Sequence, residues 1–188
     1  MATARESQGV RQAEVDVAQV KQYAEEALNC HRELRQAKRA LKELAKEYPV
    51  IEAQAPVVGT MTACVLWVHL GDPSMYDCGA AYRKAMGLNL TEFSSGQWQG
   101  RIKISKRGHG DVRRWLYFSA LRWIKEEPIH SWYEQKKSKK SGQANDQAMR
   151  GIVGVMRKLA LALYQVGACG ATFDPQLLFP GAKKKKAA

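Results

Sequence analysis

The sequence predicts a mainly α-helical protein in which a long N-terminal helix precedes a compact helical domain with one short β-ribbon. Residues 10–48 contain neither Pro nor Gly and repeat apolar or small side chains at helical spacing. Residues 111–125 and 145–166 also place apolar side chains along one helical face. Residues 101–104 instead alternate basic and apolar side chains, which is typical of a strand.

The N-terminal segment carries a heptad-like seam, in which spacings of three and four residues alternate and polar side chains surround the seam. His31 and Lys38 interrupt it. Its members are Ala13, Val17, Val20, Ala24, Ala27, His31, Leu34, Lys38, Leu41, Ala45 and Tyr48. We therefore expect one long helix, which either pairs with a second copy as a coiled coil or packs against its own chain.

A break at Pro49 is expected to end this helix. The turn Pro56-Val-Val-Gly59 then precedes an apolar helix at residues 60–69. This order resembles a helix-hairpin-helix, in which N–H groups at the start of the second helix bind a DNA phosphate without reading sequence. Gly59 and Thr60 would make that contact. The alternative is that Gly59 only permits a tight corner between two helices.

The remaining elements complete one domain. We expect a turn at residues 71–74, a helix at residues 75–86 and a shorter segment that begins at residue 129. The helix at residues 111–125 would bury Val112, Trp115, Leu116, Ser119 and Trp123, and the last helix would bury Ile152, Met156, Leu159 and Leu163. The predicted organisation is a long helix over residues 1–49, a domain over residues 50–180 and a disordered basic tail over residues 181–188.

The charge of the chain favours a polyanionic partner. Among its 188 residues, 30 Lys and Arg against 18 Asp and Glu give a formal net charge of +12. Neutralising phosphates releases condensed counterions, so this surplus favours binding to nucleic acid. No apolar run has the length of a membrane span, the start of the chain is polar, and the four scattered cysteines form no metal-binding pattern. These features predict a cytoplasmic protein without a membrane partner.

The positive charge is concentrated between residues 97 and 140. This stretch has 12 basic and 4 acidic side chains, so it holds 8 of the 12 net charges. Its bases are Arg101, Lys103, Lys106, Arg107, Arg113, Arg114, Arg122, Lys125, Lys136, Lys137, Lys139 and Lys140. Arg113 and Arg114 open a predicted helix, where the helix dipole favours anions, so an anionic ligand would stabilise them. The alternative is a solvated basic face without a ligand.

Several short motifs occur in an order and spacing that resemble the C-terminal transposase half of the insertion-sequence-one-hundred-and-ten/Piv family. They cover roughly residues 50–180, and the preceding long helix is similar to the coiled-coil segment of that family. The motifs are Pro56-Val-Val-Gly59, Gly71-Asp72, Gly87-Leu88, Ser95-Gly96, Gly100-Arg-Ile-Lys-Ile-Ser-Lys-Arg-Gly108, Val112-Arg-Arg-Trp-Leu116, Val155-Met-Arg-Lys-Leu159 and Phe173-Asp174-Pro175.

The resemblance implies an enzyme that cuts and rejoins DNA. Members of the family carry an N-terminal RuvC-like domain whose acidic cluster holds magnesium, and a C-terminal domain whose Ser-Gly motif supplies a serine nucleophile. That motif falls here on Ser95-Gly96, with Ser94 as the alternative serine. This sequence has no acidic cluster, because Asp72, Asp77, Glu92 and Asp111 lie apart. We therefore expect magnesium in the RuvC-like domain and no cofactor in this chain, which alone should bind DNA but cleave it poorly or not at all.

The residues after Ser95 suit this chemistry. A hydroxyl that attacks a DNA phosphorus forms a phosphoserine ester, which conserves bond energy for rejoining. The negative charge that develops on the phosphoryl group needs nearby cations. Candidate nucleic-acid contacts are Arg101, Lys103, Lys106, Arg107, Arg113 and Arg114. His109 is a candidate proton shuttle or a turn-forming residue.

The resemblance also implies partners: element ends and target DNA, an element-encoded guide RNA, and a homodimer or homotetramer. It places the protein in a bacterial or archaeal cytoplasm, on the nucleoid. Two alternatives stay open. One is a non-catalytic DNA-binding scaffold in which Ser95 is incidental, and the other is a structural RNA-binding protein that uses the basic segments and the lysine tail.

Overall fold

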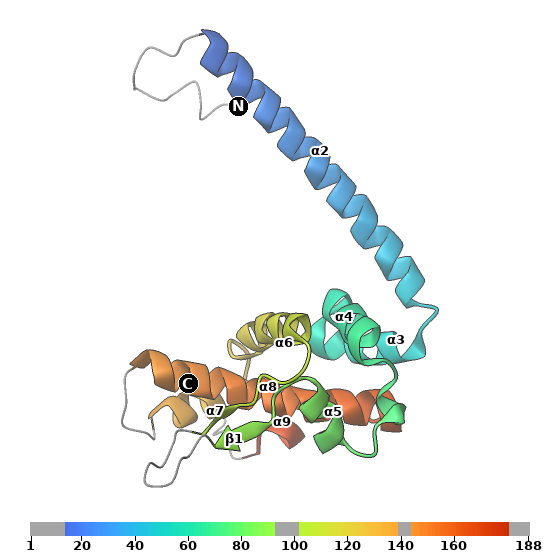
Figure 1. Ribbon diagram of the computed structural model, residues 1–188, viewed down its shortest axis with the longest axis vertical. Helices are drawn as coiled ribbons and strands as arrows, with labels where there is room; N and C mark the ends of the chain where they lie inside the picture. Colours follow the sequence, from blue (N-terminus) through green and yellow to red (C-terminus); the bar gives the residue numbers. More distant parts are fainter. Residues whose placement is uncertain (1–13, 93–101, 139–143, 181–188) are drawn as a thin grey trace, which may run out of the picture. The chain divides into compact units, whose positions relative to one another are not determined.

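The computed structural model describes residues 14–92, 102–138 and 144–180, and it confirms a mainly α fold (Figure 1). The helices are α2 (Glu14–Ala45), α3 (Pro49–Val58), α4 (Thr60–Leu70), the 3-10 helix η1 (Pro73–Met75), α5 (Gly79–Ala85), α6 (Gly110–Trp123), α7 (Ile129–Ser138), α8 (Ala144–Cys169) and α9 (Pro175–Leu178). Strands β1 (Leu90–Glu92) and β2 (Ile102–Ile104) form one antiparallel ribbon. The chain divides into two compact units, Met1–Glu43 and Leu44–Ala188.

The described part of the first unit is a single helix, most of α2. Its apolar side chains are exposed, with Val20 at 55% and Leu34 at 50% of their full accessibility. Tyr23 and Leu28, which flank the seam, are exposed as well. A helix that buries so little apolar surface gains no stability from packing within its own described unit.

Helix α8 is the centre of the second unit, and α3, α5, α6 and α7 all pack against it (Figure 1). The predicted core positions Ile152, Met156, Leu159 and Leu163 are all buried, which confirms the helical pattern read from the sequence. The segment Gln147–Cys169 of this helix is also long and apolar enough to cross a membrane, with a mean hydropathy of 1.4, and 44% of the tested window is buried inside the protein. In the described fold it is the core helix.

Helix α6 buries one face against α4 and α8. Val112, Leu116 and Ser119 are buried as predicted, whereas Trp115 and Trp123 are only half-buried. Ala120 completes the buried face. The two tryptophans flank the core rather than fill it.

Residues 49–58 form a helix where a break and a turn were expected. Pro49 occupies the first turn of α3, where a backbone N–H has no intrahelical acceptor and is not missed. Pro56 lies near the end of the same helix, so its missing N–H removes one hydrogen bond from the last turns. Gly59 alone joins α3 to α4, with φ +86°.

Residues 75–86 do not form the single helix that was expected. The Asp72 carboxylate accepts a hydrogen bond from the Ser74 N–H at 2.8 Å and thereby begins η1. The Tyr76 hydroxyl donates to the Leu70 carbonyl at 2.8 Å. These local bonds hold the segment in a turn, and α5 begins only at Gly79.

Candidate nucleic-acid interface

The β1–β2 ribbon holds both ends of the segment that contains the predicted nucleophile. Glu92 pairs with Ile102, and Leu90 pairs with Ile104. Strand β2 confirms the predicted strand, whereas β1 was not predicted. Glu92 and Ile102, the two described residues that border residues 93–101, therefore lie side by side.

Four predicted site residues belong to that connecting segment: Ser94, Ser95, Gly96 and Arg101. They lie outside the described residues, as do Lys139 and Lys140 of the basic stretch. Their roles stay predictions.

The other end of the ribbon is fixed to the body of the second unit by a close crossing of two backbones. Gly108 has φ +137°, and a Cβ there would lie 2.3 Å from the Ala85 carbonyl oxygen. A Cβ on Gly87 would lie 2.9 Å from the Arg107 carbonyl oxygen. Side chains at these two positions would force the backbones apart, so glycine is required at both.

Arg113 ties the crossing together from α6. One of its guanidinium nitrogens donates to the Gly108 carbonyl at 3.0 Å and lies 3.5 Å from the Met86 carbonyl. These carbonyls stabilise a cation in the first turns of α6, where the helix dipole would otherwise disfavour it. The dipole argument for an anionic ligand therefore applies to Arg114, whose side chain is exposed, more than to Arg113.

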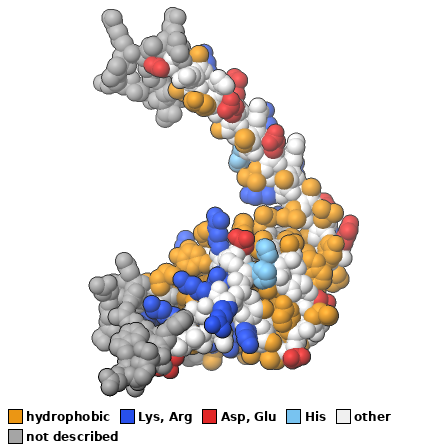
Figure 2. Space-filling model, viewed as in Figure 1, with side chains coloured by type: hydrophobic (Ala, Val, Ile, Leu, Met, Phe, Trp, Pro, Cys, Tyr) orange, Lys and Arg blue, Asp and Glu red, His pale blue; other side chains and the backbone are white. Residues whose placement is uncertain are grey.

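Four of the predicted cations are exposed and face solvent: Lys103, Lys106, Arg107 and Arg114. Lys103 lies on β2, and Lys106 and Arg107 follow it toward the crossing. Lys106 adopts the left-handed conformation with φ +55°, which costs a non-glycine residue about 1 kcal/mol. Figure 2 shows Lys and Arg side chains gathered on one face of the second unit. The exposed cations thus lie along the ribbon and at the start of α6.

His109 occupies the N-cap position of α6, and its ring centroid lies 5.1 Å from that of His69 at the end of α4. Its backbone carbonyl accepts a hydrogen bond from the Arg113 N–H at 3.3 Å. No sequence pattern indicated this histidine pair, because the two positions are 40 apart in the chain. The backbone role of His109 at the helix start fits a turn-forming residue.

The corner at Gly59 is supported by the end of α6. The guanidinium of Arg122 and the indole N–H of Trp123 donate to the Val58 and Val57 carbonyls, which lie at the C-terminus of α3. Such terminal carbonyls have no intrahelical donor, and a cation there suits the helix dipole. Arg122 also lies beside Gly59, since a Cβ on that glycine would come within 3.2 Å of a guanidinium nitrogen. Gly59 and Thr60 are both partly accessible.

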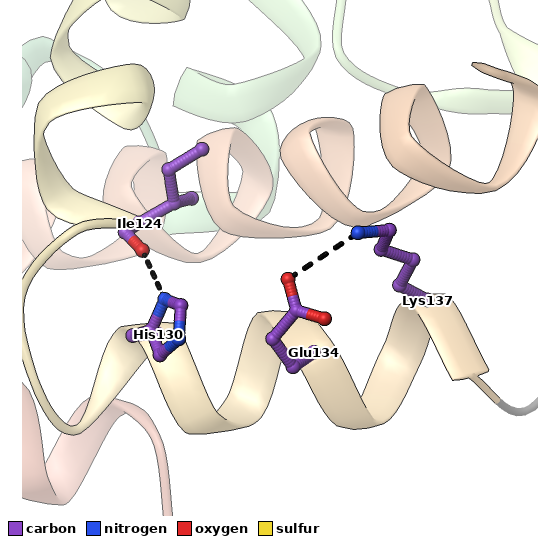
Figure 3. A network of polar contacts seen from close by, with 4 residues as sticks. All are labelled: Ile124, His130, Glu134 and Lys137. Atoms are coloured by element: carbon purple, nitrogen blue, oxygen red, sulfur yellow. Dashed lines mark hydrogen bonds and ion pairs between the residues drawn. The ribbon is translucent and has the colours of Figure 1, made fainter. Parts of the chain in front are cut away.

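Part of the basic stretch lies on α7 and makes contacts within the chain. Figure 3 shows the His130 ring against the end of α6, where its Nδ1–H donates to the Ile124 carbonyl at 3.0 Å. The same view shows Lys137 beside Glu134, with 3.5 Å between the charged groups. This ion pair is solvent-exposed and contributes about 0–1 kcal/mol. Lys137 is thus already paired within the chain.

A cluster of aromatic rings and lysines joins α7, α8 and the residues after α9. Lys136 lies 5.4 Å and Lys158 5.6 Å from the centre of the Trp132 ring, and Lys158 also lies 5.1 Å from the Phe179 ring. The Lys158 ammonium donates to the Leu178 carbonyl at 2.6 Å. Burial lowers the pKa of Lys158, and the charge of Lys136 lowers it further. These contacts anchor the C-terminal segment on α8.

Two arginines were not among the predicted nucleic-acid contacts. Arg83 on α5 and Arg157 on α8 are half-buried, and each has a buried Nε without a hydrogen-bond partner. Arg157 lies within the motif Val155-Met-Arg-Lys-Leu159, beside the buried positions Met156 and Leu159, whereas no sequence pattern indicated Arg83. In the described part of the chain, no group of three or more His, Cys, Asp or Glu side chains could hold a metal ion.

Comparison with known proteins indicates a class of protein for the part of the chain that carries the exposed cations. No curated protein sequence matches the chain. Residues 53–134, from α3 to α7, match the family described as "Transposase IS116/IS110/IS902 family". The match contains the Gly59 corner, the ribbon, the Gly87–Gly108 crossing and α6. Over residues 53–134 the chain is therefore similar to transposases of the IS116/IS110/IS902 family.

Proposed function

We propose that this chain is the serine-bearing half of a DNA transposase, and that Ser95 is the nucleophile that cleaves and rejoins DNA strands. The observation that carries the proposal is the family match over residues 53–134, which encloses the Ser95-Gly96 motif together with the basic ribbon. In the sequence, Ser95 follows Glu92, the last residue of β1, by three residues.

The exposed cations supply what a phosphodiester needs. Lys103, Arg107 and Arg114 face solvent along the ribbon and α6. They would hold the DNA backbone and draw charge from the phosphoryl oxygens as Ser95 attacks. Arg101, next to the end of β2, is the nearest basic side chain to Ser95 in the sequence.

Each step of the proposed reaction forms one P–O bond and breaks another. The Ser95 Oγ forms a bond to phosphorus while one P–O ester bond of the strand breaks, and the leaving oxygen takes up a proton. The product is a phosphoserine ester and a free hydroxyl end. A hydroxyl end of another strand then attacks the same phosphorus, which restores a phosphodiester and returns the proton to the serine.

Thr60 is a second candidate contact for a DNA phosphate. The first N–H groups of α4 have no intrahelical acceptor, and Arg122 lies beside the preceding Gly59. A phosphate there would accept from these N–H groups and pair with the guanidinium without reading base sequence.

The proposed enzyme works with several partners. A RuvC-like domain outside this chain would hold magnesium and assist the attack. An element-encoded RNA would select the DNA sites, and two or four copies of the chain would bring the strands together. The chain would act in the cytoplasm, on the nucleoid.

A covalent-adduct assay tests the nucleophile. The chain is mixed with the RuvC-like domain, the guide RNA, magnesium and a labelled DNA duplex that carries the element end. We expect a protein–DNA species that survives denaturing electrophoresis and yields phosphoserine on hydrolysis. Ser95→Ala abolishes it, whereas Ser94→Ala retains it.

The same assay separates the proposal from a non-catalytic scaffold. If the chain were a non-catalytic scaffold, it would bind the duplex but form no covalent adduct even with both serines present. An adduct that persists in Ser95→Ala and disappears in Ser94→Ala would move the nucleophile to the neighbouring residue.

A further inference from the structure

Arg83 and Arg157 form an uncompensated pair of positive charges at the junction of α5 and α8. The Nε of each side chain is buried and has no hydrogen-bond partner. In the described part of the chain, no ion pair joins either guanidinium to an acidic side chain. Leaving buried donors of this kind without a partner destabilises the fold, more so for charged groups.

The packing of α5 on α8 fixes the position of the pair. Gly79 lies so close to α8 that a Cβ there would come within 3.2 Å of both Leu161 and Tyr164. Arg83 is one helical turn further along α5, and Arg157 is one turn before Leu161 on α8. The two arginines therefore lie next to the close α5–α8 contact at Gly79.

The two guanidinium groups influence each other electrostatically. Burial lowers the pKa of Arg157, and the charge of Arg83 lowers it further. No acidic side chain contributes to this shift. Arginine stays protonated in proteins, so both charges persist and repel each other.

We propose that Arg83 and Arg157 together bind a phosphate of the nucleic-acid backbone. A phosphodiester offers two charged oxygens, and the planar guanidinium forks match that geometry better than lysine would. The phosphate would bind against the two guanidinium groups and offset the repulsion between them. That the phosphate belongs to a nucleic acid rests on the proposed transposase function, whereas the anion site itself does not.

Helix α5 links the arginine pair to the ribbon. Helix α5 ends two residues before Gly87, which is part of the ribbon crossing. The Arg83 carbonyl accepts the Leu88 N–H at 3.3 Å, so the arginine and the ribbon belong to one continuous turn. A strand bound at the pair would therefore be held beside the elements that carry the β1–β2 ribbon.

Single substitutions in the full chain test the site. Arg83→Gln and Arg157→Gln are compared with Lys84→Gln, which removes one exposed charge from the neighbouring position of α5. Binding to a duplex DNA and to a folded RNA of equal length is measured over a range of salt concentrations. We expect each arginine variant to bind at least one of the two about tenfold more weakly than Lys84→Gln does, with a shallower salt dependence.

A second measurement shows whether the variants are merely misfolded. In low salt without phosphate, both arginine variants should melt no lower than the unchanged chain, because they remove repulsion and an unpaired donor. Inorganic phosphate should raise the melting temperature of the unchanged chain and leave that of the variants nearly constant. Arg157→Lys, which keeps the charge but loses the fork, should give an intermediate phosphate response.

The proposal fails if the arginine variants bind both nucleic acids as well as Lys84→Gln does. It also fails if they melt lower and phosphate stabilises them as much as the unchanged chain, since the pair would then be structural. Neither measurement depends on strand cleavage, so the Ser95 proposal can fail while this one stands.

Discussion

Gln54 shows how a single buried polar side chain joins three helices of the second unit. It is 1% exposed on α3, and its amide donates to the Leu163 carbonyl on α8 at 3.0 Å. The same nitrogen lies 3.4 Å from the Tyr82 hydroxyl oxygen on α5. A buried amide without these partners would destabilise the fold, so the polar contact fixes how α3 and α5 sit on α8.

The Tyr82 hydroxyl is the pH-sensitive member of this contact. Burial raises the pKa of Tyr82 from its ordinary value of 10 to about 12, against the lowering effect of Gln54. A folded-state pKa above the unfolded one means that the stabilisation is complete below pH 10 and is lost as pH rises toward about 12. Two pKa units correspond to about 3 kcal/mol.

We predict that Tyr82→Phe reduces the loss of folding stability at alkaline pH. At neutral pH the variant should be about 1 kcal/mol less stable, because Gln54 loses an acceptor. Between pH 10 and 12 the unchanged chain should lose more stability than the variant does. Urea unfolding at several pH values measures both, with Tyr23→Phe on the exposed α2 as the control. Equal pH profiles for Tyr82→Phe and the unchanged chain would contradict the assignment.

The limits of sequence reasoning are visible in two adjacent residues. Arg113 and Arg114 look alike in the sequence, and both were predicted to contact nucleic acid. Arg113 contacts the carbonyls of a crossing formed by residues far away in the chain, whereas Arg114 is exposed. No local pattern separates them, because the difference comes from the position of Met86 in the fold.

At the scale of elements, the sequence predicted what depends on local periodicity and missed what depends on distant pairing. Helices α6 and α8 follow directly from the spacing of their apolar residues. Strand β1 is only three residues long and exists because β2 pairs with it. Helix α3 was missed because its two prolines, Pro49 and Pro56, lie where a helix tolerates them.

The anchoring of the ribbon on α6 gives a prediction at this scale. Arg113→Gln removes a hydrogen bond to the Gly108 carbonyl and the contact with Met86, so it should lower stability by about 1–2 kcal/mol. Arg114→Gln should change stability by less than about 0.5 kcal/mol and weaken DNA binding several-fold. Thermal melting and DNA titration of the two variants measure the contrast.

Both substitutions remove one positive charge, so a difference between the two variants reflects the position of the arginine. If Arg114→Gln lowered the melting temperature and Arg113→Gln did not, the ribbon would not be held by the contact described. Loss of DNA binding in Arg113→Gln alone, at full stability, would assign that arginine to the ligand instead of the crossing.

At the scale of the whole molecule, the chain is a core-bearing unit joined to a helix whose seam is exposed. The transposase match covers residues 53–134 and thus lies within the second unit. Helix α2 instead leaves Val17, Val20 and Leu34 of its predicted seam open to solvent. The sequence indicated the helix from its period, but a seam identifies no partner by itself.

We predict that α2 pairs with α2 of a second copy as a coiled coil. A seam with apolar side chains at alternating three- and four-residue spacing buries them only when another helix covers it. Val20→Glu with Leu34→Glu places two charges on that seam and should convert an oligomer to a monomer. Light scattering after gel filtration measures the mass, and circular dichroism should show a loss of helix at the same time.

The matched control is Gln19→Glu with Gln36→Glu, which adds the same two charges to α2 away from the seam. It should keep the oligomer mass. The second unit has its own buried core around α8, so its melting transition should be unchanged in both double variants. If the seam variant kept both the mass and the helix content of the unchanged chain, α2 would not be the pairing element. The copies would then have to meet through the second unit, and the exposed seam would be open to a different chain.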